Sequence, residues 1–543
     1  MKKEKSFIGI EAFVILFFLC LTVFSLYWKV QTGFDTDEQY AIVTAGRFLR
    51  GDRYMLDIFD AYQFSGLFES VFWALSLRWF ANNPVIGYRL ISIAVSMLAG
   101  LPVLHWLYRR SESLALAVMG YLVWITALPK SILSLEHAGI AKILIAYLIL
   151  LADGWINGKL HPVLTGIVFS LLALAYPTMV VLAVPVFLYQ IIKKQYREAG
   201  VFAVVCTLIA AAVFVPVAAR AGIAGLFQSI RMIGMDESHT VSAAAKLDLL
   251  KEDGMEFLRY GLRMLEYGAA ACAGYFLARY AFRKEKPDMA AGIIVMCAVP
   301  FLHIVMKLAL QRWTPLYLYD RYLLVLLVTA AAAAVRKNKG GTAAAVLLVL
   351  IWIIGFATTN NGFYSPDGLI IPAVLVFAAV MGNKQRQRLV RGFLAAVLLS
   401  QCACMVLTAR LTSTMANTVF AEYFRSYKGL PGLRIEPESA DFFTFAEYCT
   451  PLMESDNLVV SVYDGYAYMI TGKKVFAPVT LSTVVYGKQW DIYCSDRMPE
   501  NLNVLAENDD FESEELLRIL EQWYTKKTVV SRHGYQLYYL ERQ

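Results

Sequence analysis

Residues 1–410 alternate between long apolar segments and short polar connections. Most of the apolar segments are long enough for a helix that crosses a hydrocarbon core of about 30 Å. The connections are of two kinds, one rich in Lys and Arg and one poor in both. The rich connections are the N-terminus, 109–110, 159, 193–197, 283–286, 336–339 and 384–391, and the poor ones are 31–83, 129–137, 221–256, 307–320 and 359–367. Because basic loops stay in the cytoplasm, this pattern predicts a multi-pass protein of the plasma membrane with a cytoplasmic N-terminus.

The apolar segment at 161–192 is too long for one untilted crossing at about 1.5 Å per residue, and basic residues flank both of its ends. We therefore expect two short helices that enter and leave the membrane on the same side, with Tyr176-Pro177-Thr178 at the turn. Counting this pair as two, the chain has about thirteen transmembrane helices. An odd number places the C-terminus outside, opposite the N-terminus.

The character of the chain changes near Leu411, where the hydropathy falls. Short strands are predicted at 457–463 and 528–540, and an amphipathic helix at 512–524. The predicted fold is therefore mainly α, a polytopic membrane protein with a small C-terminal extracytoplasmic α/β domain. The division is a transmembrane domain at 1–410, with its first external loop and juxtamembrane helix at 28–83, and a C-terminal domain at 411–543.

Composition agrees with a membrane protein. Hydrophobic residues make up 58% of the 543 residues and charged residues 17%, and the mean hydropathy is +0.53, which excludes a disordered chain, a collagen and a disulfide-built module. The net charge of +7 divides into +14 for 1–410 and −7 for 411–543. The positive charge therefore reports topology, so the expected partner is a lipid bilayer and no nucleic acid. In an extracytoplasmic tail, Cys449 and Cys494 either form a disulfide or remain separate thiols.

An acidic turn follows the first apolar segment, with Asp35, Asp37 and Glu38 close to the membrane exit. Helical spacing continues to Arg50, and Gly51-Asp52 ends it. One interpretation is helix capping, because Asp35 with Glu38 fits the capping-box spacing. The other interpretation is a chemical function. Three crowded carboxylates repel one another, and this cost is offset if they bind a substrate hydroxyl or a divalent cation or if one of them acts as a base. A carboxylate there is suited to removing a proton from an acceptor hydroxyl, and Asp35 with Asp37 is the candidate pair for Mg²⁺ or Mn²⁺.

The same turn opens the pattern Asp37-Glu38-x-Tyr40-Ala41-x-x-x-Ala45-x-Arg47-x-Leu49-x-Gly51-Asp52-x-x-Tyr54. This pattern resembles the GT-C superfamily of integral-membrane glycosyltransferases, in the branch of the protein O-mannosyltransferases and the bacterial lipid A aminoarabinose transferase. The resemblance implies that Asp37 is the base, that the donor is a sugar on a polyprenyl phosphate, and that transfer occurs with inversion at the outer face. Many relatives carry His or Pro-Pro later in this loop, where this chain has residues 60–66, which leaves the acceptor class open.

Three further clusters lie on the predicted outer side. Lys130 with Glu136-His137 is either an ordinary loop with an ion pair or part of the site. Arg321, with Tyr322, is either an interfacial cation or the group that binds the donor phosphate, because a guanidinium matches phosphate oxygens. His303 and Lys307, one turn apart, are candidates to join it, and Asn361 lies in a turn whose amides are suited to sugar hydroxyls.

These features predict an enzyme, an inverting glycosyltransferase that moves a sugar from a polyprenyl-phosphate carrier to a cell-envelope lipid, glycan or protein. Asp37 is the predicted base, with Asp35 and Glu38 orienting the acceptor or holding a cation. Arg321 and Lys130 are predicted to meet the charge of the leaving group. Two rival hypotheses are a transporter or flippase of a polar or lipid-linked substrate and a surface-glycan polymerase or ligase.

Overall fold

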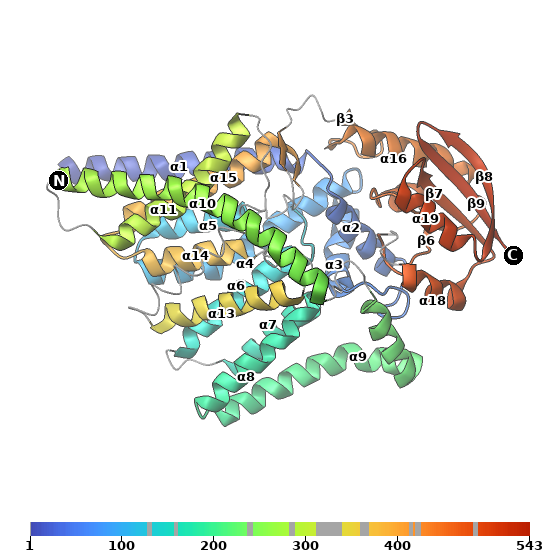
Figure 1. Cartoon of the computed structure of the whole chain (residues 1–543), viewed down its shortest axis with the longest axis horizontal. Coiled ribbons are helices and arrows are strands. Elements are labelled where there is room, and N and C mark those ends of the chain that lie inside the picture. The colour runs from blue at the N-terminus through green and yellow to red at the C-terminus, as the bar shows by residue number, and fades with distance from the viewer. Residues whose placement is uncertain are drawn as a thin grey trace.

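The computed structural model describes residues 2–127, 133–156, 161–235, 243–281, 288–310, 339–358, 369–411, 416–418, 425–481 and 487–543. Figure 1 shows a bundle of long helices with the N-terminus at one end and a small sheet, which carries the C-terminus, at the other. The chain is thus a mainly α membrane protein with a small C-terminal α/β region, as the sequence predicts.

Among the described residues, six helices are long and apolar enough to span a membrane. Shorter apolar helices of 10–17 residues accompany them. The predicted total of thirteen depends in part on residues outside the described ranges, and it stays a prediction. The helices up to residue 156 are α1 (Lys2–Val30), α2 (Thr36–Leu49), α3 (Gln63–Trp79), α4 (Pro84–Ser111), α5 (Leu114–Ile125) and α6 (His137–Ile156). After residue 287 the membrane part continues with α11 (Met289–Ala309), α13 (Lys339–Thr358), α14 (Ile370–Met381) and α15 (Gln387–Leu407).

The predicted interruption in 161–192 is confirmed. Helix α7 (Pro162–Ala175) ends at Tyr176, and a 3-10 turn, η1 (Pro177–Leu182), leads into α8 (Ala183–Ile192). Proline at the first position of the turn has no N–H with which to continue the hydrogen bonding of α7. Both α7 and α8 pack against the following helix, α9 (Tyr196–Ile233), so the interrupted pair is supported from one side.

The predicted connection at 221–256 is helical for most of its length. Helix α9 continues to Ile233, and α10 begins at Ala243 and ends at Ala281. The two halves of α9 meet at Gly222, whose φ of 74° is outside the helical range. Glycine adopts this conformation without a Cβ penalty, so the chain bends there and resumes a helix.

The C-terminal region is built around a five-stranded sheet in the order β6-β5-β7-β9-β8. Strand β5 pairs in parallel with β6 and β7, whereas β9 pairs antiparallel with β7 and β8. The predicted strand at 528–540 is a hairpin, because His533 and Gly534 take positive φ angles of 54° and 84°. The strands are β1 (Thr408–Leu411), β2 (Ala416–Thr418), β3 (Arg425–Ser426), β4 (Arg434–Ile435), β5 (Asn457–Val460), β6 (Lys474–Val475), β7 (Asn501–Glu507), β8 (Tyr524–Arg532) and β9 (Tyr535–Arg542), and the helices are α16 (Pro437–Cys449), η3 (Thr450–Leu452), α17 (Ala467–Thr471), α18 (Gly487–Arg497) and α19 (Phe511–Leu520).

The two cysteines of this region do not form a disulfide. Cys449 and Cys494 are both free and buried. Burial raises the pKa of each thiol to about 12. Both therefore stay protonated near neutral pH and behave as small apolar core residues.

Candidate active site at the start of helix α2

The three carboxylates of the acidic turn have different surroundings. Asp35 is the N-cap of α2, and its Oδ1 accepts a 2.9 Å hydrogen bond from the backbone N–H of Asp37. Glu38 is buried and forms an ion pair with Arg89 of α4, at 2.6 Å between Oε2 and Nη2. Asp37 lies half-buried on the first turn between them. The capping interpretation thus holds for Asp35, and the contacts of Glu38 favour a supporting role for that side chain.

Arg89 connects the acidic turn to the membrane bundle. Its side chain is 1% exposed, and it donates to both carboxylate oxygens of Glu38, at 2.8 and 2.6 Å. The same guanidinium donates to the carbonyl oxygens of Lys29, Val30 and Gly33, at 3.2, 2.8 and 2.5 Å. Those carbonyls end α1 and form the turn before α2. A bidentate pair inside the protein therefore fixes the direction in which α2 leaves the membrane helix.

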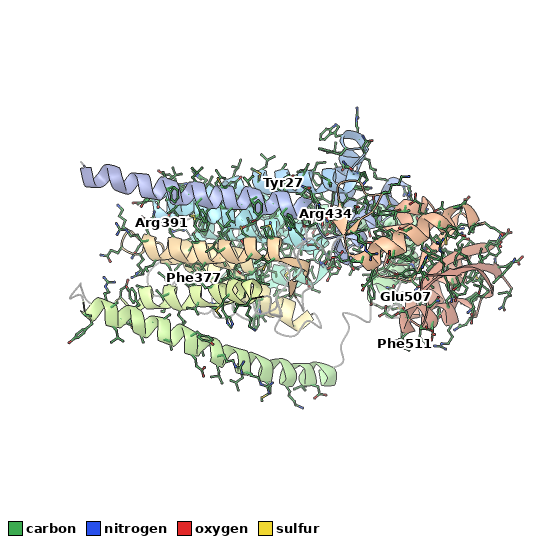
Figure 2. All side chains as sticks on the ribbon, turned by 90° about the horizontal axis from the view of Figure 1, so that it is seen from above. Tyr27, Phe377, Arg391, Arg434, Glu507 and Phe511 are labelled. Carbon is green, nitrogen blue, oxygen red and sulfur yellow. The ribbon has the colours of Figure 1, made fainter. Side chains whose placement is uncertain are left out.

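The turn before α2 is also paired with the C-terminal region. The N–H of Gly33 donates to the carbonyl of Arg434 at 2.8 Å, and the N–H of Arg434 donates to the carbonyl of Gln31 at the same distance. Figure 2 shows Arg434 where the membrane helices meet the C-terminal region. Gly33 has a φ of 72°, which favours glycine at this position.

Gln39 joins α2 to the C-terminal region from within. Its buried side chain donates from Nε2 to the carbonyl of Phe34 at 3.1 Å and to Asp464 Oδ1 at 2.7 Å. Its Oε1 accepts from the backbone N–H of Tyr466 at 3.0 Å. These three bonds satisfy the amide, which is otherwise costly to bury, and they lie two residues from Asp37.

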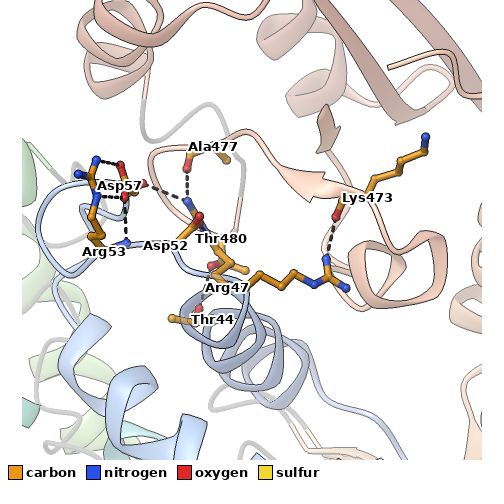
Figure 3. Close-up of polar contacts among 9 residues, drawn as sticks. Thr44, Arg47, Asp52, Arg53, Asp57, Lys473, Ala477 and Thr480 are labelled. Atoms are coloured by element: carbon orange, nitrogen blue, oxygen red, sulfur yellow. Dashed lines mark hydrogen bonds and ion pairs between the residues drawn. The ribbon is translucent and has the colours of Figure 1, made fainter. Parts of the chain in front are cut away.

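The rest of α2, with its C-cap Arg50, contacts residues on both sides of β6 (Figure 3). The hydroxyls of Thr44 and Thr480 lie 2.8 Å apart. Arg47 donates to the carbonyl of Ala477 at 3.0 Å and forms an ion pair with Asp52 at 2.8 Å. Arg50 donates to the carbonyl of Lys473 at 2.8 Å. Helix α2 is thus held along its length by the C-terminal region and does not lie alone on a membrane surface.

A group of rings comes together at the start of α6. The ring of Tyr62, which precedes α3, stacks on His137 with centroids 4.1 Å apart, and Tyr176 at the end of α7 lies 5.5 Å from Tyr62. Glu136 accepts from the backbone N–H groups of Ala138 and Gly139, and its Oε2 lies 2.8 Å from His137 Nδ1. Glu136 and His137 thus lie together within a ring cluster drawn from three segments of the chain, whereas Lys130, the third member of the predicted cluster, lies outside the described residues.

Glu69 of α3 is a buried acid near this cluster. Its side chain is 1% exposed, and its Oε2 has no hydrogen-bond partner among the described residues. Burial raises the pKa of Glu69 well above its usual range, the charge of Glu136 raises it further, and Tyr88 opposes the shift. Burial therefore favours the neutral form of Glu69, because a neutral carboxyl costs less to bury than a carboxylate.

Replacing Glu69 by Gln tests this protonation state. In the unfolded chain Glu69 ionises above its ordinary pKa, so the stability of the parent falls as the pH rises from about 4.5 toward the raised folded pKa. Gln does not titrate. Glu69→Gln should therefore be more stable than the parent at pH 8, with the difference shrinking toward pH 5, as measured by unfolding midpoints in one detergent. A difference that grows toward low pH would contradict a protonated Glu69.

The other predicted site residues lie elsewhere or outside the described ranges. His303 and Lys307 lie on α11, where the ring of His303 contacts Tyr267 of α10 at 5.6 Å. The remaining four candidates lie outside the described residues: Lys130, Arg321, Tyr322 and Asn361.

The described residues offer no metal centre. Within the described ranges, no group of three or more His, Cys, Asp and Glu side chains is arranged to hold a metal ion. Asp35, one of the two acids suggested for a cation, uses its carboxylate as the helix cap.

Several residues of this site were missed by sequence reasoning. Arg89 and Glu69 lie in apolar helices, and a single sequence does not show that Arg89 contacts the acidic turn or that Glu69 is buried near Glu136. Tyr62 and Tyr176 had a signal, since each lies at a polar interruption that the sequence pattern marks. Their stacking with His137 depends on helix packing between distant segments, which periodicity does not report.

Comparison with family models and with curated protein sequences gives no match. Among solved structures, the chain is similar to ArnT from Cupriavidus metallidurans bound to undecaprenyl phosphate, with 14% identity and a TM-score of 0.41 over 98% of each chain. It is also similar to ArnT from the same organism in the apo state, with 13% identity and a TM-score of 0.39 over 98% of each chain.

Proposed function

We propose that this chain is a membrane glycosyltransferase that moves a sugar from a polyprenyl-phosphate carrier to a cell-envelope acceptor at the outer face. The observation that carries the proposal is the acidic turn. Asp35 caps α2 and Glu38 is held by Arg89, so these two carboxylates help to orient the helix that bears Asp37. Asp37 is then placed at a fixed position on the first turn, as a general base requires.

In this mechanism Asp37 removes the proton from the acceptor hydroxyl as that oxygen attacks the anomeric carbon, which inverts. The carrier phosphate leaves with the bonding electrons, and Arg321 and Lys130 are the proposed cations that meet its charge. The ring cluster of Tyr62, His137 and Tyr176 offers flat apolar faces on which a sugar ring can pack. Tyr62 and His137 lie at connections that the predicted topology places outside, and Tyr176 lies at the turn of the helix pair at 161–192.

A transfer assay tests this function. The purified full-length chain, in lipid nanodiscs, is incubated with radiolabelled polyprenyl-phosphate sugars and an extract of envelope lipids and glycans. We expect label in a new glycosidic product and release of polyprenyl phosphate in equal amount. In vesicles, movement of the labelled sugar across the membrane while it is still bonded to its carrier would instead support the transporter hypothesis. Transfer of whole glycan chains would support the ligase hypothesis.

Topology is tested separately. Basic loops inside and an odd helix count predict that a reporter active only outside the membrane works when fused after Gln543 and fails when fused after Arg197. A cytoplasmic reporter fused at the same two positions gives the reciprocal control. Activity of the outer reporter at Arg197 would contradict the same-side reading of 161–192.

A further inference from the structure

A lateral pocket lies at the opposite end of α2 from Asp37. It has a volume of about 410 Å³, within the range of about 300–1,000 Å³ usual for ligand sites. Three elements form it: the end of α2 with the loop after it, α3, and α9. Eleven residues of helix, or about 17 Å, separate Asp37 from the lining residue Phe48, so the pocket is distinct from the candidate active site.

The lining changes from apolar to polar along α9. Ala212, Val213 and Pro216 lie deeper along this candidate membrane span, and Leu67 of α3, which is 40% exposed, faces them across the pocket. Arg220 follows at the end of the apolar run, two residues before the bend at Gly222. On the predicted topology this order runs from the hydrocarbon core toward the outer headgroup level. An occupant must therefore be amphipathic, with its polar part at Arg220.

The charge of the polar end favours an anion. Asp52 of the lining is paired with Arg47 at 2.8 Å, and Arg53 is paired with Asp57 at 2.7 Å, so these charges are balanced. Arg220 is exposed and has no ion-pair partner among the described residues. The pocket thus combines one unbalanced guanidinium with an apolar slot beside the membrane. A guanidinium binds phosphate oxygens through paired N–H donors.

The adjoining loop gives the polar end a fixed wall. Met55 and Leu56 are buried against Val217 of α9, and the ring of Tyr54 packs edge-on to Phe64 of α3, with centroids 6.3 Å apart. The bidentate contact of Arg53 with Asp57 holds the same loop. These contacts keep the hollow open from its sides, so the pocket is a feature of the packed structure and not of one mobile side chain.

We propose that this lateral pocket binds one anionic phospholipid of the outer leaflet, with the phosphate at Arg220 and an acyl chain between α3 and α9. The source of the phosphate is a membrane phospholipid, because the apolar half of the pocket opens among residues of a membrane span. The proposal is independent of the glycosyltransferase function.

Native mass spectrometry of the full-length protein tests the site. The protein in detergent is titrated with phosphatidylglycerol or with phosphatidylcholine carrying the same acyl chains. We expect one phosphatidylglycerol molecule to bind tightly, and its affinity should fall as the salt concentration rises. Arg220→Gln should weaken it roughly tenfold or more, as for the loss of a hydrogen bond to a charged group. Arg220→Lys should weaken it less, because the charge remains while the paired donors are lost.

Two further variants separate charge from shape. Arg231→Gln removes an exposed guanidinium from the same helix outside the pocket, and it should leave the affinity unchanged. Leu67→Trp fills the apolar end of the pocket without changing its charge, and it should weaken the binding of phosphatidylglycerol. Unfolding midpoints of all variants are measured. If Arg220→Gln fails to fold, the binding of phosphatidylglycerol to Arg220→Lys and Leu67→Trp tests the proposal.

Several results would overturn the proposal. Equal binding of the two phospholipids, or parental affinity in Arg220→Gln, would leave Arg220 an ordinary interfacial cation. Displacement of phosphatidylglycerol by millimolar inorganic phosphate would make the pocket a site for free anions. If equimolar polyprenyl phosphate displaces phosphatidylglycerol from the parent, and Arg220→Gln no longer binds polyprenyl phosphate, the pocket belongs to the carrier lipid.

Discussion

Replacing Asp37 by Asn is expected to lower sugar transfer by about 10²- to 10⁴-fold, the range usual for loss of a general base. Asn keeps the size of the side chain and cannot take the proton of the acceptor hydroxyl. Stability should change little, because Asp35, and not Asp37, is the N-cap. The loss of one negative charge in the first turn costs about 0.3–1 kcal/mol. The measurement is single-turnover transfer from a labelled polyprenyl-phosphate sugar, with donor binding determined separately.

Asp35→Asn is the matched control for this experiment. It removes a carboxylate two residues away, and Asn caps a helix about as well as Asp. Its transfer rate should therefore stay within a few-fold of the parent. Parental turnover in Asp37→Asn would end the assignment of Asp37 as the base. An equal loss in both variants would instead indicate that the charge of the turn matters, whichever residue carries it.

Replacing Arg89 by Leu is expected to lower the free energy of unfolding by about 3–5 kcal/mol, because Glu38 is left as a buried, unpaired carboxylate. The carbonyls of Val30 and Gly33 also lose their donor. Transfer should fall together with stability, since α2 no longer leaves the membrane in one direction. Unfolding is followed by SDS titration in mixed micelles. Arg109→Leu, at an exposed position of the same helix, should have a small effect.

A double variant separates the two parts of this effect. Glu38→Leu combined with Arg89→Leu removes the unpaired charge but still leaves the carbonyls without a donor. It should be more stable than Arg89→Leu alone and less stable than the parent. Full recovery would mean that the ion pair alone explains the loss. Parental stability in Arg89→Leu would show that the pair does not hold the acidic turn.

The elements that local pattern determines were predicted well. The break at Tyr176-Pro177 follows from proline chemistry, and the helix after the acidic turn follows from its spacing and from Gly51 at its end. The connection predicted at 221–256 is largely helical, because a single glycine, Gly222, bends α9 without ending it. Hydropathy reports where a chain leaves an apolar environment, and it does not report whether the helix stops there.

The candidate site was only partly accessible from the sequence. The acidic turn was found because its charge is unusual beside a membrane helix, but its three acids are alike in sequence. Glu38 is distinguished by a partner far along the chain, Arg89, which lies 51 residues away. Glu69 and Tyr176 were not selected, because burial and ring stacking arise from the packing of helices.

The bond between Gln39 and Asp464 has a consequence for the biosynthesis of the chain. The two residues are separated by 425 positions. At about 5–20 residues per second, the partner of Gln39 emerges from the ribosome roughly 20–85 s after Gln39 itself. During that interval the face of α2 that later contacts the C-terminal region has no protein partner. The nascent chain therefore leaves this face of α2 uncovered by the C-terminal region for most of its synthesis.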